Sequence, residues 1–125
     1  MIVPAIEAQA RRSFRSKGGI REFGAIEWVA DGGAASAEMS AALAVFEAGG
    51  SNAEHTHPNC EELVYVLDGE IEHTLGEQST VLRAGDLFVV PRHAPHRLVN
   101  RSGAPCRMLI VFPAVEREFV EVRRS

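Results

Sequence analysis

GGSNAEHTHPNCEE at residues 49–62 and GDLFVVPRHAPHRLVN at residues 85–100 decide how this chain folds and what chemistry it can carry. Together the two stretches supply His55, His57, Glu62 and His96. Three neutral imidazoles and one carboxylate suit first-row transition metals, and a set of four leaves coordination positions open for water or substrate. The two stretches therefore predict a site for a single metal ion.

The sequence around these stretches predicts short strands separated by turns. The expected strands cover residues 26–29, 41–47, 63–67, 70–75, 79–83, 87–90, 96–100 and 106–112. Asp68-Gly69 has the composition of a β-hairpin turn, and Gly76-Glu77 predicts another turn. Strands at intervals of about 8–12 residues with glycine and proline between them are typical of an all-β sandwich or barrel.

The length of 125 residues favours a single domain. Residues 1–19 look irregular, because Pro4 comes early and Gly18-Gly19 at the end predicts a break. The sequence therefore predicts an irregular N-terminal segment at residues 1–19 and one β domain at residues 20–125.

Composition argues against several classes of partner. A formal net charge of -4 gives no electrostatic basis for binding nucleic acid. No apolar run approaches the roughly 20 residues that a membrane span needs, and the N-terminus resembles no secretory signal. Cys60 and Cys106 form neither a metal-binding pair nor a disulfide framework, so we expect free thiols in the cytoplasm.

The spacing of the histidines allows them to meet. His55 and His57 are two residues apart, and alternate side chains of an extended backbone point to the same side. Pro58 then bends the chain. His96 follows the constrained loop at residues 91–95, where another strand starts. In a closed β-architecture such strand starts can line one interior, although they lie far apart in sequence.

The carboxylate ligand has two candidates. Glu61 and Glu62 are adjacent and point to opposite faces of an extended chain, so only one of them can face the metal. The spacing alone leaves both open.

The two stretches resemble the paired motifs of the cupin family. The matching positions are Gly49, His55, His57, Glu62 and Gly69 in the first motif, and Gly85, Pro91, His96 and Asn100 in the second. Nine of the ten motif positions agree, and the exception is His93, where the family usually has glycine. Glycine permits a left-handed backbone that histidine adopts only at some cost, so the shape of the loop before His96 is open.

The resemblance covers about residues 40–112 and implies a small jelly-roll β-barrel of the cupin 2 type, with a divalent metal inside. It also implies that Glu62, rather than Glu61, is the carboxylate ligand. Members of the family are commonly homodimers that exchange N-terminal strands, so we expect residues 20–29 to cross between two subunits. The family carries many reactions, and function must therefore be argued from the site.

The implied cofactor is one divalent transition metal ion. Iron or manganese is favoured, and nickel, copper or zinc suits the same ligands. With open positions for dioxygen and a substrate oxygen, the site favours a metal-dependent oxidoreductase of the dioxygenase type that acts on a small oxygenated organic molecule. The alternatives are a non-redox lyase or isomerase acting on a sugar or keto acid, and a non-catalytic domain that binds a metal or ligand.

One further histidine is a weak catalytic candidate. His73 lies on the same strand face as Ile71 and Leu75, among apolar neighbours. It is either a base beside the metal ligands or, as we favour, a core histidine satisfied by one hydrogen bond. Trp28, the only tryptophan, is expected at a dimer seam without a chemical role.

Overall fold

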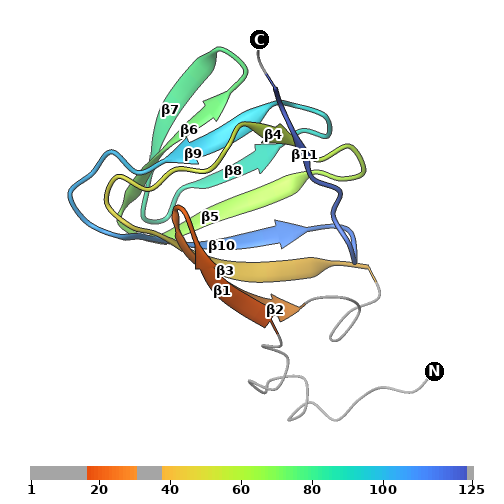
Figure 1. Cartoon of the computed structure of the whole chain (residues 1–125), viewed down its shortest axis with the longest axis horizontal. Helices are drawn as coiled ribbons and strands as arrows, with labels where there is room; N and C mark the ends of the chain where they lie inside the picture. Colours follow the sequence, from red (N-terminus) through yellow and green to blue (C-terminus); the bar gives the residue numbers. More distant parts are fainter. Residues whose placement is uncertain (1–16, 31–37, 124–125) are drawn as a thin grey trace.

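Two antiparallel β-sheets face each other in the computed structural model, which describes residues 17–30 and 38–123 (Figure 1). The strands, in chain order, are β1 (Lys17–Arg21), β2 (Gly24–Ala30), β3 (Ser40–Phe46), β4 (His55–Thr56), β5 (Glu62–Asp68), β6 (Glu70–Leu75), β7 (Gln78–Arg83), β8 (Leu87–Val90), β9 (His96–Val99), β10 (Cys106–Phe112) and β11 (Val120–Glu121). One sheet has the order β1-β2-β3-β10-β5-β8 and the other has the order β11-β4-β9-β6-β7. This arrangement confirms the predicted all-β jelly-roll architecture.

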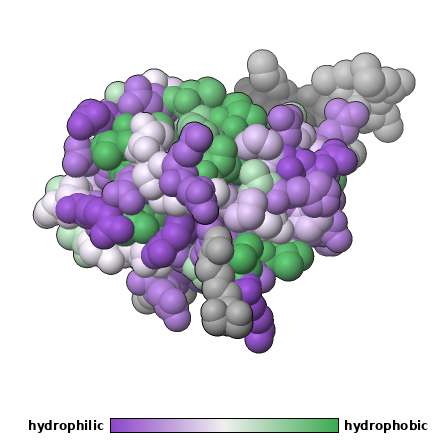
Figure 2. Space-filling model, turned by 90° about the horizontal axis from the view of Figure 1, so that it is seen from above, coloured by the Kyte–Doolittle hydropathy of each residue, from purple (hydrophilic) through white to green (hydrophobic). Residues whose placement is uncertain are grey.

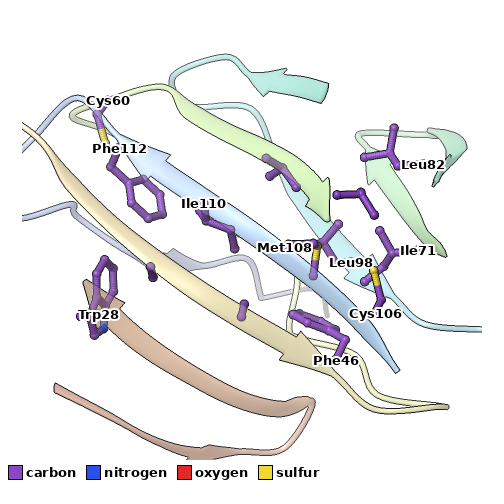
Figure 3. Packing of buried hydrophobic residues seen from close by; sticks show 14 residues of the cluster. Trp28, Phe46, Cys60, Ile71, Leu82, Leu98, Cys106, Met108, Ile110 and Phe112 are labelled. Carbon is purple, nitrogen blue, oxygen red and sulfur yellow. The ribbon is translucent and has the colours of Figure 1, made fainter. Parts of the chain in front are cut away.

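The core lies between the sheets because the strands alternate buried and less buried side chains. In β3 and β10 every second residue is buried, as period-two strands with one covered face require. From β10, Met108, Ile110 and Phe112 belong to one buried cluster with Ile71 and Leu98 of the other sheet (Figure 3). The core therefore holds the two sheets at a fixed spacing, and residues at strand ends can face one another across it.

The sequence predicts most strand boundaries to within one or two residues, but it misses β1 and the two-residue strands β4 and β11. Strand β1 begins at Lys17 and runs through Gly18-Gly19, the pair expected to end an irregular segment. Pairing of Gly18 with Glu27 and of Gly19 with Ile26 uses backbone groups, so it requires no strand-forming side chain. The other residues of the expected irregular segment, 1–16, lie outside the described residues.

The hairpin predicted at Asp68-Gly69 is wrong. The strands on either side of this pair belong to different sheets, because β5 pairs with β10 and β8 whereas β6 pairs with β7 and β9. Gly69 has a φ of 86° and turns the chain from one sheet to the other. The same residue types favour a hairpin and a sharp corner, since both need a positive φ. The turn at Gly76-Glu77 does join paired strands, β6 and β7.

We expect Gly69→Ala to destabilise the fold more than Gly76→Ala. Both glycines have positive φ values, 86° and 60°, so each substitution carries a left-handed penalty of about 1–2 kcal/mol. At Gly69 a Cβ would also lie 2.6 Å from the carbonyl oxygen of Pro105, whereas at Gly76 it would meet nothing within 4 Å. Urea denaturation of both variants measures the difference, and equal losses of stability would show that the corner tolerates a side chain.

The N-terminal hairpin pairs within its own chain. Strand β2 pairs with β3 from Gly24 opposite Phe46 to Ala30 opposite Ala41. Exchange of residues 20–29 between two subunits stays a prediction. Polar side chains cover much of the surface in Figure 2, with apolar patches between them. No helix in the described ranges is long and apolar enough to cross a bilayer.

Candidate metal centre

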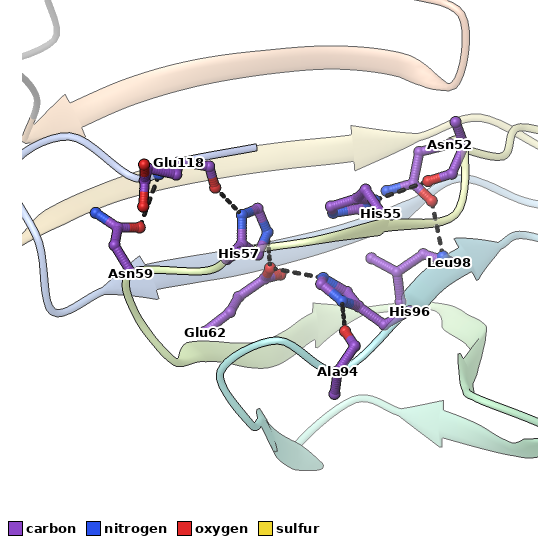
Figure 4. A network of polar contacts seen from close by, with 10 residues as sticks. Asn52, His55, His57, Asn59, Glu62, Ala94, His96, Leu98 and Glu118 are labelled. Atoms are coloured by element: carbon purple, nitrogen blue, oxygen red, sulfur yellow. Dashed lines mark hydrogen bonds and ion pairs between the residues drawn. The ribbon is translucent and has the colours of Figure 1, made fainter. Parts of the chain in front are cut away.

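Four side chains predicted as ligands meet between the two sheets (Figure 4). They are His55, His57, Glu62 and His96, and their candidate ligand atoms all lie within 4.8 Å of one another. All four side chains are buried, with exposures between 2% and 5%. Their convergence confirms the geometric part of the prediction.

Strand pairing positions each of the four residues. His55 lies in β4 directly opposite His96 in β9, so the two imidazoles belong to one sheet. His57 follows two residues later on the same side. Glu62 is the first residue of β5 in the opposite sheet and is buried, whereas Glu61 is exposed. The alternation of the extended chain therefore places Glu62, and not Glu61, in the site.

Backbone carbonyls fix the orientation of each imidazole. The Nδ1 atoms of His55, His57 and His96 lie 2.7–2.8 Å from the carbonyl oxygens of Ala53, Glu118 and Ala94 respectively. A carbonyl oxygen only accepts hydrogen bonds, so each Nδ1 carries the proton and donates it. The Nε2 atom of each ring therefore points to the centre of the group, and where the ring is neutral this atom presents a lone pair, as in metal-ligating histidines.

The resulting cluster of electron pairs fits a divalent cation. Glu62 Oε1 lies 2.9 Å from His57 Nε2 and 3.2 Å from His96 Nε2. Two acceptors at such a distance repel each other unless a proton or a metal ion lies between them. The buried His57 Nε2 has no hydrogen-bond partner among the described residues, as expected of a lone pair that faces a carboxylate oxygen. One proton on His96 would give the Glu62 carboxylate a hydrogen bond, but the lone pairs of the other two rings would still face inward. A metal ion would instead bind an electron pair from each of the four side chains.

The protonation states also favour metal binding. Burial by itself raises the pKa of Glu62, but the contacts with His57 and His96 outweigh burial and lower that pKa to about 2. Burial, followed by the charge of His96, lowers the pKa of His55 to about 4. At neutral pH the site therefore contains an ionised carboxylate and a neutral His55, the forms that bind metals.

We expect metal binding to release a proton from His96 near neutral pH. Burial lowers the pKa of His96, but the hydrogen bond and charge of Glu62 prevail and raise it above 6.5. The proton stays on His96 below that raised pKa and competes with the metal, so apparent affinity should fall about tenfold per pH unit as pH decreases. Competition with a chromophoric chelator between about pH 8 and about pH 5 measures this slope. A constant affinity over that range would contradict the protonation scheme.

The loop before His96 accommodates the unusual His93. This residue is exposed and has a φ of 68°, so it adopts the left-handed backbone that glycine usually provides. Its backbone N–H donates to the carbonyl oxygen of His57 at 3.2 Å, and the next residue, Ala94, supplies the acceptor for His96. The loop therefore keeps its role in positioning the histidines.

His73 lies near His96 in the core and does not line the cavity. His73 is buried, its ring lies 4.2 Å from that of Phe88, and the ring of His96 is 6.2 Å away. Neither ring nitrogen has a hydrogen-bond partner within the described part of the chain, so none of the described residues supplies the expected hydrogen bond. Burial, followed by the charge of His96, lowers the pKa of His73 to about 4, so the ring is neutral and packs like an apolar side chain. A catalytic role for His73 stays a prediction.

The C-terminal segment, residues 113–123, covers one side of the site, although no pattern in the sequence indicated this. Strand β11 pairs with β4, placing Glu121 opposite His55 (Figure 1). Phe119 stacks on the His55 ring at 4.4 Å. Asn59 holds the segment by donating to Glu116 O and accepting from Glu118 N. The segment thus supports two of the three imidazoles.

A cavity of about 300 Å³ adjoins three of the four residues. His55, His57 and Glu62 form one wall, and aromatic side chains that include Trp28, Phe46 and Phe112 form much of the rest. Trp28 therefore lines the cavity in this structure, and its expected place at a dimer seam stays a prediction. Arg117 and Phe119 also line the cavity, and sequence reasoning identified neither of them.

Comparison with known proteins agrees with this geometry. The Cupin domain model matches residues 42–112. Germin-like protein subfamily 2 member 2 of Arabidopsis thaliana is 37% identical over 79 residues, which cover 59% of this chain and 36% of that protein. The chain thus spans little more than a third of this relative.

Two solved structures of oxalate oxidase are similar to this chain. One, in complex with the substrate analogue glycolate, has a TM-score of 0.63 at 30% identity and covers 68% of this chain and 46% of that chain. The other has a TM-score of 0.73 at 27% identity and covers 96% of this chain and 68% of that chain. With its two-sheet fold, its cluster of three histidines and a glutamate, and the matched domain model, the chain belongs to the cupin family.

Proposed function

We propose that this cupin is a metal-dependent oxidoreductase of the dioxygenase type that acts on a small oxygenated organic molecule. The observation that carries the proposal is the buried set of three histidines and Glu62 beside a cavity of about 300 Å³. A volume of this size is at the lower end of the range for small-molecule sites. The similarity to oxalate oxidase structures supports chemistry on a small oxygenated compound.

The residues of the chain would hold the cation and prepare the cavity. His55, His57, Glu62 and His96 would be the ligands, and iron or manganese is the favoured ion. When bound, such an ion supplies Lewis acidity and redox chemistry. The backbone carbonyls that accept from the Nδ1 atoms keep the imidazoles oriented, so little reorganisation is needed when the substrate arrives.

The apolar cavity walls would limit the access of water to the reacting groups. Apolar aromatic side chains that are almost fully buried line the cavity beside the imidazoles. They belong to Phe46, Phe112 and Trp28. A dry cavity strengthens electrostatic interactions with the substrate and limits side reactions. The four ligands leave coordination positions for a substrate oxygen and a second small molecule.

Oxygen consumption tests this proposal. Protein loaded with iron or manganese is mixed with enols, catechols, β-diketones and oxalate in an oxygen electrode, and metal-free protein is the control. We expect uptake that depends on both metal and substrate. Turnover that continues without oxygen would instead identify a non-redox lyase or isomerase. Tight binding without any turnover would identify a non-catalytic domain.

A further inference from the structure

His57 differs from the other two histidines of the site in the origin of its orienting carbonyl. The acceptors for the Nδ1 atoms of His55 and His96 lie two residues earlier in the sequence. The acceptor for His57 Nδ1 is the carbonyl oxygen of Glu118, which is 61 residues away along the chain and at a distance of 2.7 Å. The orientation of His57 therefore depends on the position of the C-terminal segment.

Asn59 holds the residue that orients His57 (Figure 4). Its Oδ1 accepts from the backbone N–H of Glu118 at 2.8 Å, and its Nδ2 donates to the carbonyl oxygen of Glu116 at 2.9 Å. The backbone N–H and carbonyl of Glu118 thus bridge Asn59 and His57, which are two residues apart. A shift of the Glu118 backbone would change both contacts together.

The same segment covers two imidazoles of the site. The Phe119 ring stacks on His55 with 4.4 Å between the ring centroids and 20° between the planes, and it lies 5.9 Å from the ring of His57. Phe119 is nevertheless 49% exposed, so one side of the ring contacts the imidazoles and the rest faces solvent. Movement of the segment away from the site would therefore expose two predicted ligands to water.

The attachment of the segment is of the kind that opens locally. Strand β11 has two residues, both exposed, and it pairs with β4. The two side-chain hydrogen bonds of Asn59 also lie at the surface. Short exposed pairings have low free energies of local opening, whereas core strands open at a cost close to that of global unfolding.

A bound cation and a closed segment require the same state of His57. A cation takes the lone pair of Nε2, so the proton of the neutral ring must be on Nδ1, where Glu118 O accepts it. The cation also screens the repulsion between His57 Nε2 and Glu62 Oε1, two acceptors 2.9 Å apart, which otherwise favours rotation of the ring. Rotation would break the hydrogen bond to Glu118 O. Metal binding and closure of the segment therefore stabilise each other.

We propose that a cation bound to the site holds the C-terminal segment closed, and that Asn59 is a positioning residue that acts on His57 through the backbone of Glu118. Metal affinity and the order of the segment are then linked, because each favours the other by the same free energy. The inference rests on the metal-binding part of the proposed function and does not depend on the reaction.

Hydrogen–deuterium exchange tests this linkage with manganese as the only added ligand. Amide exchange is followed by mass spectrometry in metal-free and in manganese-saturated protein, so the result does not depend on turnover. In peptides that cover residues 116–123, we expect exchange to slow at least about fivefold on saturation. Strand β7 is the internal control, because it lies at the opposite edge of the five-stranded sheet from β11 and its exchange should be nearly unchanged.

Asn59→Ala tests the positioning role. We expect manganese affinity, measured by competition with a chromophoric chelator, to fall about tenfold, the lower end of the loss typical for residues that orient a metal ligand. The protection of residues 116–123 by manganese should also be lost. Asn59→Asp keeps the oxygen that accepts from Glu118 N and should retain part of this protection. Thr74→Val is the matched control, because it also removes a surface side-chain hydrogen bond, to Ser79, and should bind manganese like the wild type.

Two results would overturn the inference. One is manganese that binds the wild type but slows exchange in residues 116–123 no more than in β7. The other is an Asn59→Ala variant whose manganese affinity stays within about twofold of that of the wild type. Either result in protein that consumes oxygen would leave the proposed function standing, whereas protection in protein that never consumes oxygen would support the inference and refute the proposed reaction. Failure to bind manganese at all would overturn the inference, and oxygen consumption would still decide the proposed function.

Discussion

His57→Ala should lower the metal content of the purified protein by at least about tenfold. Replacing residues that merely orient a ligand typically costs about 10–100-fold in metal affinity, and removal of a ligand should cost no less. His57 is buried, its Nδ1 donates to Glu118 O, and its Nε2 lies 2.9 Å from Glu62 Oε1. Elemental analysis of protein purified without added metal measures the loss.

His93→Ala is the matched control for this experiment. His93 is only three residues from His96 in sequence, yet it is exposed and does not belong to the four-residue cluster. Its substitution should leave the metal content nearly intact, because the contact with His57 O is made by the backbone N–H. Equal losses of metal in both variants would mean that the ligands are wrongly assigned.

Asn100→Ala should cost at least about 3 kcal/mol of stability, a large part of the total for a domain of this size. The Asn100 side chain is fully buried, and its Nδ2 donates to the carbonyl oxygens of Phe46 and Ala104. Its Oδ1 accepts from the backbone N–H and the hydroxyl of Ser102. Alanine would leave these partners unsatisfied in or near the core, and each lost partner costs about 1–3 kcal/mol.

The backbone of Asn100 adds to this role, since it joins the two sequence motifs. Its N–H donates to Gly50 O, and its carbonyl oxygen accepts from Gly49 N. Asn59→Ala is the control, because Asn59 also makes two side-chain hydrogen bonds but at the surface. Urea denaturation should show a loss of about 1 kcal/mol or less for Asn59→Ala. A similar loss for both variants would contradict the importance of burial at Asn100.

Local patterns explain what the sequence could predict. Strand positions follow from period-two alternation and from turn residues, and both are properties of neighbouring residues. The three histidines and Glu62 could be assigned because their spacing resembles that of the cupin motifs. The opposite directions of Glu61 and Glu62 then explained why only one of them is buried.

Contacts between distant segments explain what the sequence could not predict. Asp68-Gly69 looks like a hairpin turn, and only the pairing of β5 and β6 with different partners shows that it is a corner between sheets. Arg117 and Phe119 lie in a segment without periodicity, which backbone contacts with Asn59 and pairing with β4 bring to the cavity. Trp28 faces the cavity because of the register of β2 against β3. No local signal reports these relationships.

Anomalous diffraction from crystals grown with excess manganese tests the central claim most directly. Data collected on either side of the manganese absorption edge locate the ion independently of any assay. We expect one strong peak in contact with the Nε2 atoms of His55, His57 and His96 and with a carboxylate oxygen of Glu62. Imidazoles that converge around a point without anomalous density, or a peak bound elsewhere on the chain, would contradict the account.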